Sequence, residues 1–221
     1  MTLTIYTLDW VPDFPRGFVR DMRARWVAEE IGRPYQTATV PLQPKSDAHR
    51  AMQPFGQVPI ITDGDLTLFE SGAIVLHLAT GSPLLPETRR PEITQWAFAA
   101  MNSIEPPISG WMNMQLAEAQ PEFFGPPYPP DVVTHLRQGM DAKLQPLEQL
   151  LADKDWIAGD FSAADILLAD TLRLAGDGLG DYPILTAYIA RATARPAFQR
   201  AMDAQMAHWA AADAARMAAS A

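Results

Sequence analysis

The stretch from residue 53 to residue 79, QPFGQVPIITDGDLTLFESGAIVLHLA, decides the fold of this chain. Two short apolar runs at 58–62 and 66–69 flank the tripeptide DGD, which is the turn chemistry of an antiparallel hairpin. The apolar segment that follows predicts a helix. Ser71 is its expected N-cap, because the hydroxyl can accept a hydrogen bond from a free amide of the first turn.

The same stretch carries groups that suit an anionic, peptide-like ligand. If the Val58-Pro59 bond is cis, the main chain of Val58 faces outward and can pair with a bound peptide in the antiparallel manner. The Glu70 carboxylate can hold an ammonium group, and the helix N-terminus at Ser71 can hold a carboxylate. An edge proline in a hairpin and an ordinary serine-capped helix explain each feature singly. Their conjunction indicates a binding site.

The motif PFGQVP, followed by an acidic residue and a serine at the start of a helix, resembles the glutathione site of the glutathione S-transferase family in its bacterial-type, cytosolic form. The resemblance implies a cis Val58-Pro59 bond and places Glu70 and Ser71 on the γ-glutamyl end of the tripeptide. The residues that it assigns to glutathione are Gln57, Val58, Pro59, Glu70 and Ser71. Three residues that could lie near the glycyl end are Gln43, Lys45 and His49.

The composition limits the classes of function that remain. No cysteine is present, which excludes disulfides, thiolate metal sites and a cysteine nucleophile. The net charge of −9 disfavours nucleic acid and anionic membranes as partners. The four histidines lie far apart in sequence, so no metal site is expected. No apolar stretch approaches the ~18 residues of a membrane span, and the N-terminus lacks signal-peptide features, so we expect a cytoplasmic protein.

The chain before the hairpin predicts an α/β domain. Residues 3–7 alternate as a half-buried strand does, a helix is expected from Phe18 to a stop at Gly32, and residues 35–40 read as a second strand. Residues 41–52 form a polar loop with one helical turn. This order resembles the thioredoxin-like N-terminal domain of the glutathione transferases, a mixed four-stranded sheet with helices, over residues 1–80.

The remainder of the chain predicts an all-helical domain, residues 92–221, after a linker rich in glycine and proline at 81–91. A helix begins near residue 92, and Pro106-Pro107 should break or kink it. Residues 121–130 hold five prolines and should form an irregular loop. A long helix is expected from 131 to 151.

Two further helices complete the expected helical domain. Ser162 and Asp165 form a capping arrangement before a buried helix that begins at Ala163, and this pattern resembles the capping box in the second domain of the transferases. The last helix, residues 196–217, is alanine-rich. Its composition is compatible with packing on the first domain and equally with a solvated tail.

The chemistry expected from the resemblance requires a glutathione thiolate. The model thiol pKa is ~8.5, and lowering it by two units takes roughly 2.7 kcal/mol of selective stabilisation of the anion. The family usually supplies a Tyr, Ser or Cys side chain near the end of the first strand, but residues 8–19 contain none of these and no threonine. By elimination, Thr7 and Arg16 are the candidate catalytic side chains, and the amides of residues 17–19 are expected to carry most of the stabilisation.

A second substrate, a small apolar electrophile, needs an adaptable apolar surface. The candidate residues are Trp10, Trp111, Met112, Met114 and Phe123. The resemblance also implies a homodimer joined through the helix at 71–79 and the helix at 92–101. Glutathione is then a co-substrate, and no metal cofactor is expected. The alternatives are a non-catalytic glutathione-binding or scaffolding protein of the same fold, or a glutathione-dependent reductase, isomerase or ether-cleaving enzyme.

Overall fold

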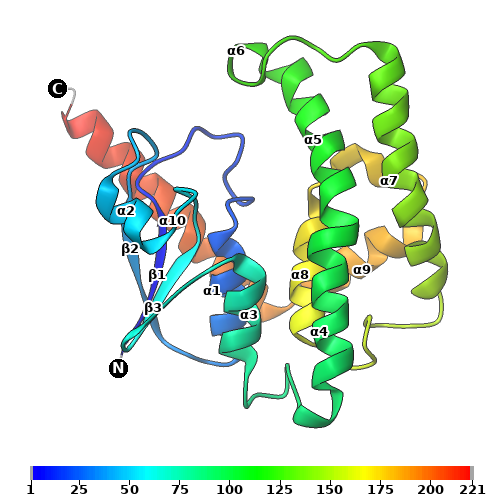
Figure 1. Cartoon of the computed structure of the whole chain (residues 1–221), viewed down its shortest axis with the longest axis horizontal. Helices are drawn as coiled ribbons and strands as arrows, with labels where there is room; N and C mark the ends of the chain where they lie inside the picture. Colours follow the sequence, from blue (N-terminus) through cyan, green and yellow to red (C-terminus); the bar gives the residue numbers. More distant parts are fainter. Residues whose placement is uncertain (1, 220–221) are drawn as a thin grey trace. The chain divides into compact units, whose positions relative to one another are not determined.

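The computed structural model describes residues 2–219, which divide into two compact units (Figure 1). The first unit contains residues 2–82 together with residues 194–219, and the second contains residues 83–193. The all-helical part therefore begins inside the segment expected to link two domains. The last helix belongs with the first unit, which is one of the two outcomes that its composition allowed.

A mixed four-stranded sheet forms the centre of the first unit, and this confirms the expected fold class. The strands are β1 (Leu3–Leu8), β2 (Tyr35–Val40), β3 (Ile60–Asp63) and β4 (Leu66–Phe69), in the order β2-β1-β3-β4. β1 is parallel to β2 and antiparallel to β3, which pairs with β4 in the predicted hairpin. Gly64 in the turn has a φ of +63°, a left-handed conformation that glycine adopts without steric cost.

Four helices accompany this sheet: α1 (Asp21–Glu30), α2 (Asp47–Met52), α3 (Ser71–Ala79) and α10 (Pro196–Ala219). α1 packs against both α3 and α10 (Figure 1). The edge of the Trp26 indole meets the Phe198 ring at a centroid distance of 4.8 Å, and Trp209 is fully buried. α10 is therefore a structural part of the first unit, held by aromatic packing against α1.

The start of α1 differs from the sequence-based expectation. The helix begins at Asp21 and not at Phe18, because the chain makes a turn in which the Phe18 amide donates to the Pro15 carbonyl and Gly17 adopts a φ of +82°. Phe18 is 40% exposed and does not belong to the buried face of the helix. Apolar spacing alone could not separate this turn from a first helical turn.

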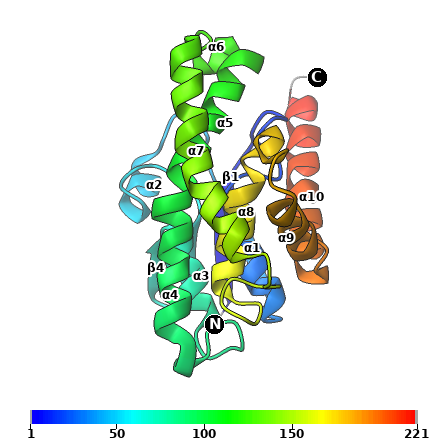
Figure 2. The same cartoon turned by 90° about the vertical axis from the view of Figure 1, so that its right-hand side faces the viewer.

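The second unit is all-helical, as expected, and α8 (Ala163–Arg173) lies at its centre with residues 163–172 buried. α8 packs against α4 (Arg90–Phe98), α5 (Glu105–Ala119) and α9 (Pro183–Thr193). Figure 2 shows the long helix α7 (Pro130–Leu150) beside α5, with which it packs. Short turns of 3-10 helix occur at Glu87–Arg89 (η1) and Gly176–Leu179 (η3).

Two helical boundaries in this unit correct the sequence-based picture. The helix does not break at Pro106-Pro107. A π-helical segment, η2 (Ala99–Ile104), joins α4 to α5, and the prolines follow it in the first turn of α5. Residues 121–130 are not wholly irregular, because Pro121–Phe124 form the short helix α6.

Candidate functional site

The strand register brings the predicted glutathione residues to one end of the sheet. Ile60 is paired with Tyr6 on one side and with Phe69 on the other. Pro59 therefore lies beside Thr7, at the end of β1, and beside Glu70, which follows the end of β4. This end of the sheet thus collects the main chain before β3, the residue after β4 and the N-terminus of α3. Among the described residues, this is where a strand end, an open main chain and a helix N-terminus meet.

Two buried side chains brace the loop that carries Gln57. The Gln53 side-chain oxygen accepts a hydrogen bond from the Gln57 amide at 3.1 Å, and His49 Nε2 lies 2.9 Å from the Gln57 carbonyl oxygen. Gln57 is exposed and Val58 is partly exposed, so buried side chains hold the inner side of the loop and its outer side faces solvent. The Val58-Pro59 bond is cis, as the sequence predicted. The bracing by Gln53 and His49 was not predicted.

The residues considered for the glycyl end behave differently from one another. His49 is buried and supports the loop, whereas Gln43 is exposed. The Lys45 side chain lies against Gly56, where an added Cβ would come within 3.2 Å of Lys45 Cγ. Partial burial lowers the pKa of Lys45. The aliphatic part of the Lys45 side chain thus lies beside the braced loop, and Lys45 remains a candidate ligand for a carboxylate.

Glu70 and Ser71 start α3 in a way that the sequence did not predict. Ser71 is the first residue of the helix and not its N-cap; Glu70 takes the N-cap position, and its carbonyl accepts from the Ile74 amide at 2.9 Å. The physical reason is the Glu70 φ of +71°, the one positive value among the described non-glycine residues. Such a backbone costs on the order of 1–3 kcal/mol and is found preferentially at functional sites.

Ser71 is 3% exposed, and its hydroxyl is held from inside the protein. Arg23 of α1, itself fully buried, donates from NH1 to Ser71 Oγ at 3.1 Å. The Glu70 side chain is exposed. The exposed Glu70 carboxylate thus lies next to the N-terminus of α3, and the buried Arg23 guanidinium contacts that N-terminus through Ser71. Together these groups can bind a ligand that carries both an ammonium and a carboxylate group.

Thr7 lies inside the core of the first unit. Its side chain is fully buried, on the face of β1 that also carries Leu3 and Ile5. Its Oγ1 is buried and has no hydrogen-bond partner among the described residues. The pKa of Asp21 is raised, because burial of the carboxylate outweighs the contribution of Arg25. Arg25 Nε lies 2.6 Å from Asp21 Oδ2. Thr7 can therefore influence a bound thiol only through its neighbours.

Arg16 and Trp10 share one carboxylate on α10. Arg16 NH1 and NH2 lie 2.6 and 2.8 Å from the two oxygens of Asp213, and the Trp10 indole N–H donates to Asp213 Oδ1 at 2.8 Å. The guanidinium of Arg216 covers the Trp10 ring at 4.2 Å from its centroid. The hydrogen bond to Asp213 raises the pKa of Arg16, and the bonds from Arg16 and Trp10 lower the pKa of Asp213 to about 2. Sequence reasoning missed this cluster, because nothing local connects residues so far apart.

Two of the three main-chain amides expected to stabilise a thiolate already donate hydrogen bonds within the protein. Gly17 N donates to the Gln205 side-chain oxygen at 3.0 Å, and Phe18 N donates to the Pro15 carbonyl at 2.9 Å. Val19 is the remaining member of the three. Gln205, another residue of α10 that the sequence did not single out, also donates to the Val19 carbonyl at 3.1 Å.

The residues predicted for an apolar substrate fall in both units, Trp10 in the first and the other four in the second. Met114 is 3% exposed and belongs to the helical core, whereas Phe123 on α6 is 65% exposed. Met112 is partly exposed. Trp111 Nε1 is buried without a hydrogen-bond acceptor, and Arg137 lies 5.6 Å from the Trp111 ring centroid.

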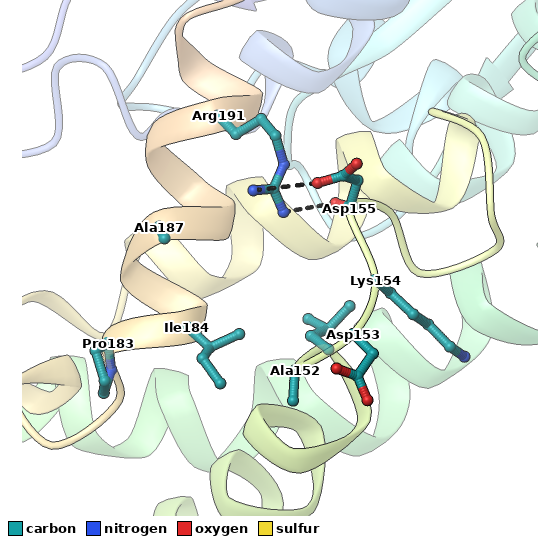
Figure 3. Close-up of a pocket in the computed structure, with 9 residues that line it drawn as sticks. Ala152, Asp153, Lys154, Asp155, Pro183, Ile184, Ala187 and Arg191 are labelled. Carbon is teal, nitrogen blue, oxygen red and sulfur yellow. Dashed lines mark hydrogen bonds and ion pairs between the residues drawn. The ribbon is translucent and has the colours of Figure 1, made fainter.

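A surface cavity of about 390 Å³ lies elsewhere in the second unit (Figure 3). It is lined by the loop after α7 and by the first turns of α9, and none of the predicted site residues borders it. Arg191 at its edge donates to the Asp155 carbonyl at 2.7 Å and lies over the Trp156 ring. Figure 3 shows this guanidinium directed at Asp155, so the charge of Arg191 is already engaged.

Other classes of site find no counterpart in the described part of the chain. In residues 2–219, no three acidic or histidine side chains are grouped so that they could bind a metal ion. Nor does any helix within that range combine the length and the apolar character that crossing a membrane requires.

Comparison with protein families gives two matches along this chain. Residues 15–80 match the model of the glutathione S-transferase N-terminal domain. Residues 112–196 match the model of the glutathione S-transferase C-terminal domain. The first match covers the hairpin and the start of α3, and the second covers α8 with its cap.

Proteins from bacteria, plants and the mouse are similar to this chain. Glutathione S-transferase GstA of Escherichia coli O157:H7 is 30% identical over 189 residues, which cover 80% of this chain and 89% of the relative. Glutathione S-transferase F10 of Arabidopsis thaliana is 29% identical over 177 residues, 75% of this chain and 77% of the relative. A crystal structure of a Burkholderia graminis glutathione transferase, with two glutathione molecules bound per subunit, has a TM-score of 0.73 and 27% identity, covering 91% of this chain and 88% of that one.

Proposed function

Because this chain belongs to the glutathione S-transferase family, we propose that it binds glutathione at the end of the sheet where Pro59, Glu70 and Ser71 lie and joins the glutathione sulfur to an apolar electrophile. The observation that carries the proposal is the strained Glu70-Ser71 start of α3 opposite the braced Val58-Pro59 loop. The E. coli and A. thaliana relatives are named as transferases, which supports the same reaction class.

Each end of the tripeptide has a counterpart in this arrangement. The main chain of Val58, which precedes β3 and lies outside its pairings with β1 and β4, pairs with the cysteinyl main chain of glutathione in the antiparallel manner. Glu70 accepts hydrogen bonds from the γ-glutamyl ammonium, and the α3 N-terminus with Ser71 receives the α-carboxylate. Gln57 contributes from the exposed side of the loop, and Lys45 lies toward the glycyl carboxylate.

Stabilisation of the thiolate is assigned to the segment before α1. The Val19 amide and the positive end of α1 favour an anion there. Thr7 and Arg16 act indirectly in this proposal, because Thr7 is buried beside Asp21 and Arg16 is bound to Asp213. The energy required for a two-unit shift, roughly 2.7 kcal/mol, is within the range of a few charge-assisted hydrogen bonds.

The test of this function has two steps. Binding of glutathione to the purified protein is measured by calorimetry, for the wild type and for Ser71→Ala and Glu70→Gln. Conjugation is then measured with an aryl halide, whose product absorbs in the near ultraviolet. We expect binding in the wild type, a loss of about tenfold in each variant and measurable conjugation. Binding without conjugation would identify a non-catalytic member of the family, and no binding would refute the proposal.

A second candidate is a glutathione-dependent disulfide reductase. It is favoured by the lack of a hydroxyl or thiol side chain between residues 8 and 19 together with the B. graminis structure, which holds two glutathione molecules per subunit. In this reaction one glutathione thiolate attacks a disulfide and releases a thiol. A second glutathione thiolate then attacks the mixed disulfide, which yields oxidised glutathione and the second thiol. Two glutathione sites per chain by calorimetry and turnover of a small dialkyl disulfide would favour it over conjugation.

The remaining assignments are a homodimer and a cytoplasmic location. The proposed dimer uses the exposed face of α4, which carries Phe98. The electrophile is assigned to an apolar class because the exposed and partly exposed candidates, Trp10, Trp111, Met112 and Phe123, are aromatic or methionine side chains.

A further inference from the structure

Arg23 lies in an unusual position for an arginine. It belongs to α1, its side chain is fully buried, and its NH1 lies 3.1 Å from the Oγ of Ser71, the first residue of α3. α1 and α3 pack directly on one another, so the contact joins two elements of the same unit. Charged side chains are rarely buried in this way without a specific partner.

The chemistry of the two groups fixes the direction of the hydrogen bond. A guanidinium has only donors, so Ser71 Oγ must be the acceptor. The hydroxyl hydrogen of Ser71 is then left to donate to a different acceptor. A serine that is oriented in this way favours an anionic oxygen over a water molecule or an ammonium group.

The electrostatics point in the same direction. The N-terminus of α3 carries about half a positive elementary charge, and the buried Arg23 guanidinium that donates to Ser71 Oγ lies beside it. The Glu70 carboxylate is exposed and supplies the matching negative charge beside it. The pattern is a buried cation under the carboxylate position and an exposed anion at the ammonium position.

We propose that Arg23 is a positioning residue that orients the Ser71 hydroxyl toward the α-carboxylate of the γ-glutamyl group and makes the site selective for ligands that carry that carboxylate. The inference rests on the proposed glutathione site and deepens it. Arg23 touches Ser71 and not the ligand, so its effect on binding passes through the serine.

The test compares glutathione with an analogue in which the γ-glutamyl α-carboxylate is a neutral amide. Affinities are measured by calorimetry for the wild type, Arg23→Lys, Ser71→Ala and the double variant. Arg33→Lys is the matched control, because Arg33 follows the same helix and pairs with Asp63, at the end of β3 that is far from Pro59. Melting temperatures of all variants report the structural cost separately.

We expect Arg23→Lys and Ser71→Ala each to weaken glutathione binding about tenfold. The double variant should bind no more weakly than the weaker single variant, because Arg23 acts on the ligand only through the Ser71 hydroxyl. The amide analogue should bind the wild type and Arg23→Lys equally. Arg33→Lys should leave glutathione affinity unchanged. A hundredfold loss in the double variant, or an equal loss for both ligands in Arg23→Lys, would overturn the proposal.

Folding failure of Arg23→Lys does not end the test. Arg23→Gln is the second variant, with the same expectations. If neither folds, the two ligands are compared on the wild type and on Ser71→Ala: the proposal requires that the serine change weakens glutathione and leaves the analogue unaffected, and equal losses refute it. Absence of glutathione binding in the wild type would refute the proposed function itself, which is a separate result.

Discussion

The Asp165 carboxylate organises the start of α8. Its Oδ2 accepts from the Ser162 amide at 2.9 Å and the Ser162 hydroxyl at 2.8 Å, and its Oδ1 accepts from the Ile157 amide at 2.8 Å and the Tyr188 hydroxyl at 2.7 Å. Burial raises the pKa of Asp165, and these donors oppose the rise. The carboxylate therefore ties the loop before α8 to the middle of α9, which is more than a capping box does.

Asp165→Ala should destabilise the second unit far more than Ser162→Ala. The aspartate change leaves two buried amides and the Tyr188 hydroxyl without an acceptor, at about 1–3 kcal/mol each, so we expect a loss of at least about 3 kcal/mol. Ser162→Ala should cost about 1 kcal/mol. Urea unfolding followed by circular dichroism measures both. The glutathione affinity of the folded fraction should not change. An equal loss of unfolding free energy in the two variants would contradict the role given to Asp165.

The hydrogen bonds that Arg16 and Trp10 donate to Asp213 should persist at acidic pH. The pKa of Asp213 is lowered to about 2, below the ~3.9 of an aspartate in an unfolded chain. Because the folded-state value is depressed, the contribution of this carboxylate to stability is complete above pH ~4 and is lost as the pH falls through about 2. The indole N–H resonance of Trp10, assigned by its absence in Trp10→Phe, should stay unchanged from pH 7 to pH 4.

The control for this titration is Asp213→Asn, in which the Trp10 resonance should be displaced at every pH. Asp203→Asn, an exposed aspartate of the same helix, should behave as the wild type. A midpoint near pH 4 in the wild type would mean that Asp213 is not paired in solution.

The helix α10 reaches the start of α1 through Gln205. This fully buried side chain accepts from Gly17 N and donates both to the Val19 carbonyl and to Asp21 Oδ1, the last at 2.7 Å. Further along the same helix, His208 Nε2 lies 2.9 Å from the Leu8 carbonyl oxygen. α10 thus supports the segment between β1 and α1, where the thiolate-stabilising groups are proposed.

Gln205→Ala should lower stability and weaken the chemistry together. Loss of three hydrogen bonds leaves the Asp21 carboxylate with one donor fewer, and we expect a cost of about 2–4 kcal/mol. The apparent thiol pKa of bound glutathione, followed by its ultraviolet absorbance, should rise. Gln199→Ala, an exposed glutamine of the same helix, should change stability by less than about 0.5 kcal/mol. An unchanged thiol pKa in folded Gln205→Ala would separate α10 from catalysis.

Local signals account for the parts of this fold that could be predicted. The DGD turn between two apolar runs specified the hairpin, and the Ser162 and Asp165 pair specified the first residue of α8. The glutathione motif depended on short-range spacing in the same way. The features that the sequence did not reveal involve residues that are far apart in the chain or are fixed by packing between elements. They are the Arg16–Asp213 pair, the Arg23–Ser71 hydrogen bond and the backbone conformation of Glu70, and no local pattern encodes them.

Association of two chains is the proposal that concerns the assembled protein. Phe98 on α4 has 59% of its surface exposed, which is unusual for a phenylalanine on a regular helix. A stable dimer through this face should bury more than ~1,000 Å² in total. We expect Phe98→Asp to sediment as a monomer at micromolar concentration, since the new charge would be desolvated in the interface.

Phe123→Asp is the matched control for the dimer. Phe123 is 65% exposed but lies on α6, outside the proposed interface, so the variant should remain dimeric. A wild-type protein that sediments as a monomer, or an equal effect of both substitutions, would refute the proposed interface.

Because residues 83–193 separate α10 from the rest of its unit, the order of synthesis matters for this protein. Ribosomes add about 5–20 residues per second, so the intervening segment takes on the order of ten seconds to make. Throughout that interval the nascent sheet and α1 are present, while Phe198, the partner of the Trp26 ring, has not been translated. The segment between β1 and α1 waits equally long for Gln205 and Asp213. The synthesis of α10, and not the emergence of the sheet, is therefore the step after which the first unit can close.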